Sequence, residues 1–428
     1  MRRILQYILK ILAKVVLWRY SPAIVAVTGS VGKSSVKEAV FCVLRKYFKV
    51  RRNMENYNNE IGVPLTILGL ETGSRSIIAW VKNFLKAGLV ILGVGKYPEI
   101  LVLEMGVDRP GDMKYLMDFV PVRAGIITAI GQFPSHIEFF PEKGKLVKEK
   151  ALIVGSLLRD GFAVLNYDDL SIRMIGDDLP ERNKIIYYGF GQGAELRITN
   201  YELRITNLNK RDFGVNFKLE YQGSIVPIRL KTVLGKQQAY AAAAAAAVGL
   251  GLGLNLVEIS ASLRKYRSLS GRTKLIKGIK NTWIIDDSYN ASPLAVISAL
   301  DILEEFGLSN GFSGRKIAVL GDMLELGNDT EDGHRQVGRK AVSTVDLLFT
   351  VGGRAGFIAE EARQQGLNSE AIFEFSSVED AAVLVQKKLK EGDIILVKGS
   401  RSIHMEKVVK EIMLYPEKAE KLLVKCLN

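Results

Sequence analysis

A short glycine-rich loop between an apolar run and a helical pattern constrains the fold of this chain more than any other feature. Residues 23–27 read as a buried strand, residues 28–35 as the loop, and the helical pattern continues to about residue 46. This order is typical of a phosphate-binding loop, whose backbone N–H groups surround phosphate oxygens. We expect Lys33 to neutralise the β and γ phosphates of a nucleotide and the Ser34 hydroxyl to reach its magnesium ion. The expected nucleotide contacts of the loop are Thr28, Gly29, Ser30, Val31, Gly32, Lys33, Ser34 and Ser35.

The composition is that of a globular protein with an excess of cations. A length of 428 residues allows two or three domains, and the net charge of +13 indicates anionic partners, such as nucleotide phosphates, a nucleotide-linked substrate or a membrane surface. No basic stretch is interleaved with aromatic residues, so we expect no nucleic-acid partner. The two cysteines, Cys42 and Cys426, do not form a disulfide framework, which favours a reducing compartment. Because the chain has three histidines, a His-rich metal centre is excluded.

The first 22 residues predict a basic amphipathic helix. Arg2, Arg3, Lys10 and Lys14 share one face, apolar residues cover the rest, and the first twenty residues contain no acid. Such a helix can lie in a membrane interface but is too interrupted by charge to span a bilayer. A helix packed on the body of the protein explains the pattern equally well. We expect a cytoplasmic protein, with or without peripheral contact at the cytoplasmic face of the membrane.

Alternating strand and helix patterns predict an α/β fold of two units. The first, over 23–268, is a P-loop domain with a parallel sheet. Polar–apolar alternation over 195–230 predicts antiparallel hairpins near its end, and residues 202–208 nearly repeat 195–201. The other expected strands of this unit are 100–104, 124–130 and 162–166.

A boundary near 268–272 separates the second unit, expected over 269–428 as a Rossmann-like α/β domain. Its sequence again alternates between short apolar runs and helical patterns. The expected strands are 283–286, 316–320, 347–351 and 393–397, with helices at 293–306 and 378–390.

Several further motifs follow the loop in a fixed order. They are NYNNEIGVP at 56–64, EMG at 104–106 with PG at 110–111, SHIE at 135–138, NYDD at 166–169, DDSYNASP at 286–293, LGDMLELG at 320–327 and KGSR at 398–401. With these motifs the chain resembles the Mur ligase family, and most closely its MurF-type members, over about residues 23–410. Many ordered motifs that agree are far more specific than any one of them.

The resemblance implies an ATP-dependent, ADP-forming amide-bond ligase of cell-wall synthesis. A substrate carboxylate attacks the γ-phosphate of ATP to give an acyl phosphate, and an amine then displaces phosphate. The implied substrates are a UDP-N-acetylmuramoyl-tripeptide-like precursor and D-alanyl-D-alanine or another amino substrate. Lys33, the loop amides and two magnesium ions would offset the repulsion between carboxylate and triphosphate. Closure around residues 268–272 would bring the two domains together.

The resemblance also implies a set of metal ligands and catalytic residues. Glu104 and His136 correspond to metal-binding positions beside Ser34, although alone they read as a surface carboxylate and a structural histidine. Lys150 stands sixteen residues before Asn166, where the family has a lysine that is carbamoylated to bind a second magnesium ion. Lys145 and Lys148 are neighbouring alternatives. The implied catalytic residues are Lys33, Glu104, His136 and Lys150.

Further positions correspond to nucleotide and substrate contacts. Asp287 and Asn290 can either contact the nucleotide or cap the helix expected from Pro293. Asp322 and Glu325 are as readily turn residues as parts of an amino-substrate pocket. The implied nucleotide contacts outside the loop are Asn59, Arg272, Asp287 and Asn290, and the implied substrate contacts are Asp322, Glu325, Lys398, Ser400 and Arg401.

The chain departs from the MurF pattern in three places. MurF-type enzymes carry a UDP-binding domain before the phosphate loop, whereas 22 residues precede Ala23 here, so we expect that domain to be missing. The family's His-Asn and later Asn on the adenine side are replaced by Gln237, Gln238 and Ala241. Ser34 replaces the usual threonine and keeps the hydroxyl.

Two alternatives to a MurF-like ligase remain. One is a Mur-fold ligase with another acceptor, of the pseudomurein, poly-glutamate or folate type. The other is a membrane-associated P-loop protein that binds ATP as a switch without ligating. The joint presence of Lys33, Glu104, His136 and Lys150 argues against the switch, which does not need all four.

Overall fold

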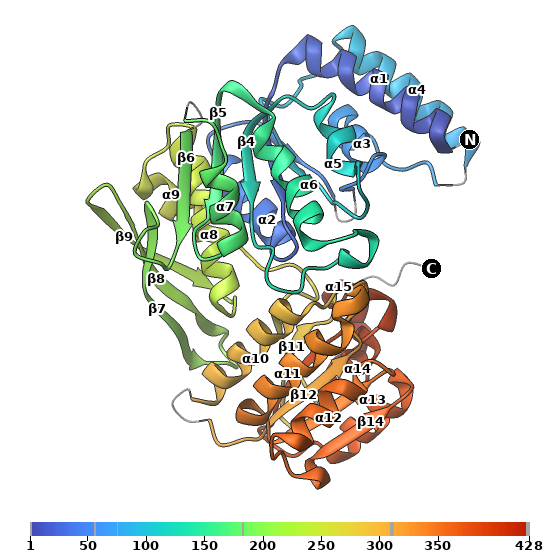
Figure 1. Cartoon of the computed structure of the whole chain (residues 1–428), viewed down its shortest axis with the longest axis vertical. Helices are drawn as coiled ribbons and strands as arrows, with labels where there is room; N and C mark the ends of the chain where they lie inside the picture. Colours follow the sequence, from blue (N-terminus) through green and yellow to red (C-terminus); the bar gives the residue numbers. More distant parts are fainter. Residues whose placement is uncertain (1, 55–56, 75, 182–183, 309–311, 425–428) are drawn as a thin grey trace.

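The protein contains two sheets, each covered by helices on both faces, which confirms the expected α/β class (Figure 1). The computed structural model describes residues 2–54, 57–74, 76–181, 184–308 and 312–424. Asn56 and Cys426, named from the sequence, lie outside the described residues. The expected boundary at 268/269 falls between helix α9 (Leu256–Leu263) and strand β10 (Lys274–Lys277).

The first sheet has nine strands in the order β2-β3-β1-β4-β5-β6-β7-β8-β9. Neighbours from β2 to β7 pair in parallel, and β7, β8 and β9 pair antiparallel. Because β1 lies between β3 and β4, the loop after β1 opens where the strand order reverses, the usual ligand crevice of open α/β sheets. The strands are β1 (Ala23–Thr28), β2 (Val50–Arg52), β3 (Ile100–Glu104), β4 (Val122–Ile127), β5 (Leu157–Asn166), β6 (Lys184–Gly189), β7 (Leu196–Asn207), β8 (Asp212–Tyr221) and β9 (Ser224–Lys231).

The parallel strands are apolar on both sides because helices cover both faces of the sheet. In β1, Val25 and Val27 pack with α2, α8 and α9, whereas Ile24 and Ala26 pack with the helices of the other face. All eight alanines of α8 are buried, because their small side chains let this helix lie between α2 and the sheet. The helices are α1 (Arg2–Tyr20), α2 (Lys33–Leu44), α3 (Gly62–Leu68), α4 (Ile77–Leu92), α5 (Asp112–Met117), α6 (Lys143–Gly155), α7 (Leu170–Asp177), α8 (Lys236–Gly251) and α9.

The antiparallel part of the first sheet reaches the second domain. Both copies of the seven-residue repeat lie on the single strand β7, with an irregular register between Thr199 and Glu202. Leu203 and Ile205 of β7 pack against the core of the second domain. Tyr201 Oη also donates a 3.0 Å hydrogen bond to Glu305 of α10. The predicted hairpin region therefore helps to join the two domains.

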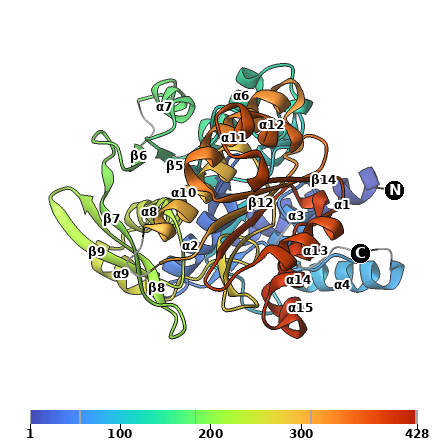
Figure 2. The ribbon, with the colours of Figure 1, turned by 90° about the horizontal axis from the view of Figure 1, so that it is seen from below.

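The second sheet has six strands in the order β10-β11-β15-β12-β13-β14, all parallel except β10. Helices α10 to α12 cover one face and α13 to α15 the other, as the view from below shows (Figure 2). The elements are β11 (Trp283–Asp287), α10 (Pro293–Gly307), β12 (Lys316–Gly321), α11 (Thr330–Thr344), β13 (Leu347–Val351), α12 (Gly356–Gln364), β14 (Ile372–Phe375), α13 (Val378–Lys388), β15 (Ile394–Lys398), α14 (Glu406–Ile412) and α15 (Ala419–Leu422).

Several expected boundaries were wrong by a few residues. Helix α2 ends at Leu44 instead of Lys46, and β4 ends at Ile127 instead of Ile130, because residues 128–131 turn toward the phosphate loop. The short strands β2, β10 and β14 lie at sheet edges. They were not predicted from the sequence, because their apolar pattern is weak.

The basic N-terminal segment folds as α1 and packs on α3 and α4. Leu9, Ala13, Val16 and Leu17 of α1 are buried, so the helix-on-body interpretation holds for its inner face. Among the described residues, no helix is long and apolar enough to cross a membrane.

Candidate active site

The loop after β1 has the conformation that a phosphate site needs. Gly29 and Gly32 have positive φ angles of 143° and 89°, which glycine adopts without strain. A Cβ at Gly29 would stand 2.1 Å from Thr128 Oγ1. Thr128 in turn donates a 2.6 Å hydrogen bond to the carbonyl oxygen of Val31, so the loop is held from the end of β4. The helix α2 begins at Lys33, and its free N–H groups point into the loop.

Two lysines converge on the loop from different helices. Lys33 Nζ donates to the carbonyl oxygen of Gly29 at 2.8 Å, and Lys150 Nζ of α6 donates to the same oxygen at 3.2 Å. Lys150 is 1% exposed, and burial, together with the charge of Lys33, holds its pKa well below the usual value. Burial also lowers the pKa of Lys33, against the opposing effect of Glu104. Lys145 and Lys148 are exposed, so only Lys150 of the three alternatives reaches the loop.

Glu104 ends β3 in a strongly cationic environment. Its carboxylate lies 3.5 Å from Lys37 Nζ and accepts a hydrogen bond from Asn58 at 3.4 Å. Burial raises the pKa of Glu104, but the combined effect of Lys37, Lys33 and Arg272 lowers it by more, so the pKa lies below the usual value. The Ser34 hydroxyl is also hydrogen-bonded to this carboxylate. Glu104 is therefore an anionic ligand next to the loop hydroxyl.

His136 connects the two domains. Its Nδ1 atom lies 2.8 Å from Glu325 Oε2, and its Nε2 atom lies 3.7 Å from Asp108. The backbone N–H of Glu138 also donates to the carbonyl oxygen of Glu325. The contact with His136 lowers the pKa of Glu325. Glu325, expected in an amino-substrate pocket, instead contacts an expected metal ligand.

The second domain contributes a paired set of polar groups. Lys398 Nζ lies 2.5 Å from Asp287 Oδ2 and donates to the carbonyl oxygen of Asn290 at 2.8 Å. Asp287 also accepts from the backbone N–H of Thr273 at 3.0 Å. The caps proposed for the helix from Pro293 are wrong, because Ser292 occupies that position. These contacts hold the β11 end and the interdomain linker together.

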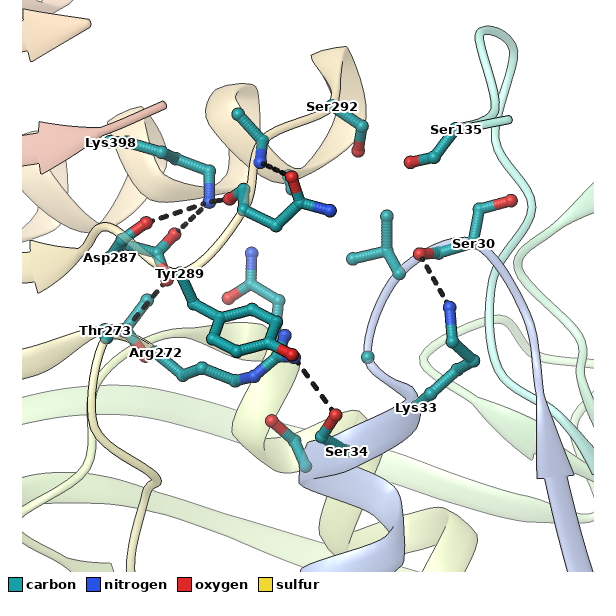
Figure 3. Close-up of a pocket in the computed structure, with 18 of the residues that line it drawn as sticks. Ser30, Lys33, Ser34, Ser135, Arg272, Thr273, Asp287, Tyr289, Ser292 and Lys398 are labelled. Carbon is teal, nitrogen blue, oxygen red and sulfur yellow. Dashed lines mark hydrogen bonds and ion pairs between the residues drawn. The ribbon is translucent and has the colours of Figure 1, made fainter. Parts of the chain in front are cut away.

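Arg272 spans the gap between the domains. Its guanidinium donates to Ser34 Oγ at 3.0 Å and stacks on Tyr289, 4.2 Å from the ring centre (Figure 3). The linker residue thereby reaches the phosphate loop directly.

A cavity of about 240 Å³ lies between the loop and the second domain. In Figure 3 the loop with Lys33 and Ser34 faces Asp287, Tyr289 and Lys398 across it. Asn58, Gln237 and Gln238 also line it. The expected site residues that line this cavity are Ser30, Val31, Gly32, Lys33, Ser34, Ser35, Glu104, His136, Arg272, Asp287, Asn290 and Lys398.

A second, more apolar cavity of about 430 Å³ shares Val31, Gly32 and Gln237 with the first. Its lining includes Tyr188, Tyr240 and Leu294, and Tyr240 Oη donates to Asp168 at 2.7 Å. Asp169 accepts from the N–H groups of Ile130 and Gly131, which fixes the segment beside the loop. A flat aromatic base can occupy such an apolar cavity while its phosphates lie on the loop.

Five expected site residues lie elsewhere. Thr28 is buried and donates to the carbonyl oxygen of Met105, and the exposed Asn59 accepts from the N–H groups at the start of α3. Asp322 accepts from Ala355 N, and Ser400 Oγ from Leu324 N, at the carboxyl edge of the second sheet. Arg401 pairs with Glu406. None of the five lines either of the two cavities around the loop.

The structure adds residues that the sequence did not single out. Lys37 follows Lys33 by one helical turn on α2, a spacing that places both on one face. Asn58 donates to Glu104 and lines the cavity, whereas the sequence singled out its neighbour Asn59 as a nucleotide contact. Tyr188 and Tyr240 come from strands and helices whose contact cannot be derived from local patterns.

The donor set suits a magnesium–nucleotide complex. No group of three or more His, Cys, Asp or Glu side chains gathers to hold a metal anywhere in the described ranges. Mg²⁺ is commonly bound through one or two protein oxygens together with substrate phosphates and water. Ser34 and Glu104, side by side at the loop, provide such oxygens.

Comparison with known proteins agrees with this geometry. The family model for the Mur ligase middle domain matches residues 27–249, and that for the Mur ligase, glutamate ligase domain matches residues 271–401. A UDP-N-acetylmuramoyl-tripeptide--D-alanyl-D-alanine ligase of Bacillus subtilis (strain 168) is 29% identical over 410 residues, which cover 95% of this chain and 79% of that protein.

Solved structures share the fold of this chain. The MurF ligase of Thermotoga maritima in complex with ADP superposes with a TM-score of 0.77 at 25% identity, over 97% of this chain and 84% of that one. A pseudomurein peptide ligase type C of Methanothermus fervidus shares the fold alone, with a TM-score of 0.62 at 17% identity, over 92% and 80% of the two chains. The chain belongs to the Mur ligase family.

Proposed function

We propose that this protein is an ATP-dependent, ADP-forming peptide ligase that joins D-alanyl-D-alanine to the peptide carboxylate of a UDP-N-acetylmuramoyl-tripeptide. The observation that carries the proposal is the cavity between the domains. There, Lys33 and the helix N-terminus of a phosphate loop face Asp287, Asn290 and Lys398 of the second domain. Lys37 and Lys150 do not line the cavity, but they contact Glu104 and the loop from the buried side. The similarity to MurF ligases over most of the chain supports the same reaction and the same substrates.

The charges at the loop suit the first step of the reaction. A carboxylate and a triphosphate repel each other, and the half-buried Lys33 and the buried Lys37 reduce that repulsion in a region partly shielded from water. The loop N–H groups would hold the β and γ phosphates, and Arg272 of the linker would contact the same phosphates. Bound magnesium would supply further positive charge at the transferred phosphoryl group.

We propose two magnesium sites. Ser34 and Glu104 would hold the first. A carbamate on Lys150 would contribute to the second, together with His136. Carbamoylation needs a neutral amine, and the burial that lowers the pKa of Lys150 favours that form. His136 also contacts Glu325 of the second domain, at 2.8 Å.

We also propose that the reaction takes place in the cytoplasm, where ATP is supplied. Peripheral contact with the membrane, expected from the first 22 residues, is a separate proposal, because it depends on the surface of α1 and not on the cavity.

Phosphate release from ATP and magnesium tests the reaction. Release that requires both UDP-N-acetylmuramoyl-tripeptide and D-alanyl-D-alanine, with the amide product identified by mass, is the expected result. Release that requires another amine or another acceptor would keep the ligase chemistry and replace the substrates, as in a ligase of the pseudomurein or folate type. ATP hydrolysis that no acceptor stimulates would favour the nucleotide switch.

The carbamate has its own test. Protein equilibrated with ¹³C-bicarbonate should show one carbamate carbon resonance that disappears in Lys150→Arg and persists in Lys148→Arg. A spectrum without that resonance in the unsubstituted protein would remove the carbamate from the second magnesium site.

A further inference from the structure

Helix α1 carries an apolar stripe on its outer side. The stripe residues recur at intervals of three and four, which places them on one face of the helix. Trp18 is 83% exposed and Ile4 and Tyr7 are each 65% exposed, although the opposite face of the same helix is buried. The members of this stripe are Ile4, Tyr7, Ile8, Ile11, Val15 and Trp18.

Helix α4 carries a second stripe of the same kind. Its inner face, with Asn83 and Ala87, is buried on the body, and its outer face is also apolar. A helix that is apolar nearly all round is normally buried on all sides, and α4 is not. The members of this stripe are Ile77, Ile78, Val81, Leu85, Leu89 and Leu92, from 49% to 79% exposed.

The two helices are neighbours along one edge of the molecule (Figure 1). Their C-terminal ends are tied together, because Tyr20 Oη donates to the carbonyl oxygen of Val90 and the Tyr20 ring stacks on Tyr97 at 4.4 Å. More than half of the large apolar side chains exposed on the described residues belong to α1, α4 and the turn after α4. We call the two stripes together the α1–α4 face. An apolar patch of this extent marks an interaction surface.

The two helices of the α1–α4 face carry charges of one sign. Residues 1–22 and 76–98 contain no aspartate or glutamate. Lys10 and Lys14 are engaged by Asp118, which directly follows α5, but Lys82 and Lys86 of α4 are exposed beside the apolar stripe. Arg19 and Lys96 are exposed near the tied ends of the helices. The face therefore combines apolar side chains with a cationic border.

We propose that the α1–α4 face docks on an anionic lipid bilayer. Apolar side chains would enter the acyl boundary, aromatic residues such as Trp18 and Tyr7 would lie at the interface, and the lysines would contact the headgroups. The helices lie on the membrane and do not cross it, since α4 has only 16 residues. A second copy of this chain fits less well, because it would bring the same positive border against itself.

Docking through this face leaves the active site accessible. The second domain lies on the other side of the first domain from α1 and α4 (Figure 1). A membrane-bound molecule would thus keep its interdomain cavity away from the lipid, and domain closure would not disturb the docked helices. The proposal is independent of which acceptor the ligase uses.

Vesicle flotation of the full chain tests the proposal. The protein should float with phosphatidylcholine vesicles that contain phosphatidylglycerol and float much less with phosphatidylcholine alone. The emission of Trp18 should shift to shorter wavelength on binding, and Trp18→Phe should remove that shift. Replacement of both Trp18 and Leu85 by glutamate should weaken binding by at least about 100-fold, because Trp18 would lie at the interface and Leu85 would enter the acyl boundary, and neither place accepts a carboxylate.

Charge reversal separates the cationic contribution. Lys82→Glu with Lys86→Glu should weaken binding by at least about 10-fold, because each cation near an anionic surface contributes to binding. The matched controls are Lys387→Glu with Lys390→Glu, which change the net charge equally on another face, and Val257→Glu on α9. The controls should bind as the unsubstituted protein does.

Two results would overturn the proposal. One is an unsubstituted protein that stays with the dense fraction in the presence of anionic vesicles. The other is equal binding of the face variants and the controls, which would show that binding depends on the net charge of the protein and not on this face. Sedimentation of the same variants without lipid identifies the alternative, since a dimer lost in the variant at Trp18 and Leu85 would assign the face to self-association.

Discussion

The carboxyl edges of the two sheets face each other across the cavity, and they differ in charge balance. At the first edge, Lys33, Lys37 and Arg272 lie near one buried carboxylate, Glu104, and lower its pKa. At the second edge, Lys398 is matched by Asp287. The first edge therefore has an unbalanced positive charge in a partly buried setting, whereas the second is balanced.

This difference indicates a division of roles. Burying several cations around one anion is costly unless a further anion arrives, so the first edge is suited to a triphosphate. The balanced pairs of the second edge hold the loop after β11 in position and need no ligand for their own stability. Arg272 and Glu325 are the points at which one edge contacts the other.

The largest expected effect comes from removing a cation of the first edge. Lys33→Ala should lower kcat by at least about 1000-fold, because charge stabilisation at the transferred phosphoryl group is lost. The free energy of unfolding should change little, since the pKa of Lys33 shows that burial disfavours its charge. Steady-state phosphate release and urea unfolding measure the two quantities. Lys46→Ala, an exposed lysine shortly after α2, is the control. A Lys33→Ala variant that kept more than a tenth of the activity would contradict the proposed division of roles between the two edges.

The positive first edge was largely predictable from the sequence, because it is encoded locally. The glycine loop fixes Gly29, Lys33 and Ser34 within a few residues of β1, and Glu104 follows directly from the end of an apolar strand. Strand ends and loop motifs place side chains without knowledge of the tertiary contacts.

The second edge was less predictable. Asp322 and Ser400 are bound to local backbone groups, and Glu325 turns toward His136, because the approach of the two domains decides these contacts. The α1–α4 face was only half visible in the sequence. Both faces of α4 are apolar, so the periodicity of its sequence does not show which face packs against the body and which face is exposed.

Breaking the balanced pair of the second edge should act mainly on stability. Lys398→Met leaves Asp287 largely buried without its cation and should cost about 3 to 5 kcal/mol of unfolding free energy. Asp287→Asn combined with Lys398→Met should recover part of that loss. Urea unfolding of both variants measures the difference. Equal losses in the single and the double variant would show that the pair is not coupled.

The buried carboxyl of Asp286 offers a test by pH. Burial raises its pKa from 3.8 to about 6, against the opposing effect of Ser288. The folded state therefore holds the proton more tightly than the unfolded state, and the free energy of unfolding falls as the pH rises from 3.8 through 6. Asp286→Asn should remove up to about 3 kcal/mol of this decline between pH 4 and pH 8. Thermal unfolding across that range checks it, and an unchanged pH profile would contradict the shifted pKa.

The contact between the two edges should give the smallest effect. Glu325→Gln weakens the contact with His136, and because Glu325 is 41% exposed the free energy of unfolding should fall by less than about 1 kcal/mol. We expect kcat/KM for the amine to fall by no more than about five-fold. Glu138→Gln, an exposed neighbour on the other side of the contact, should have no effect. If Glu325→Gln instead matched Lys33→Ala in its loss of kcat, Glu325 would belong to the chemistry of the first edge, and the two edges could no longer be assigned separate roles.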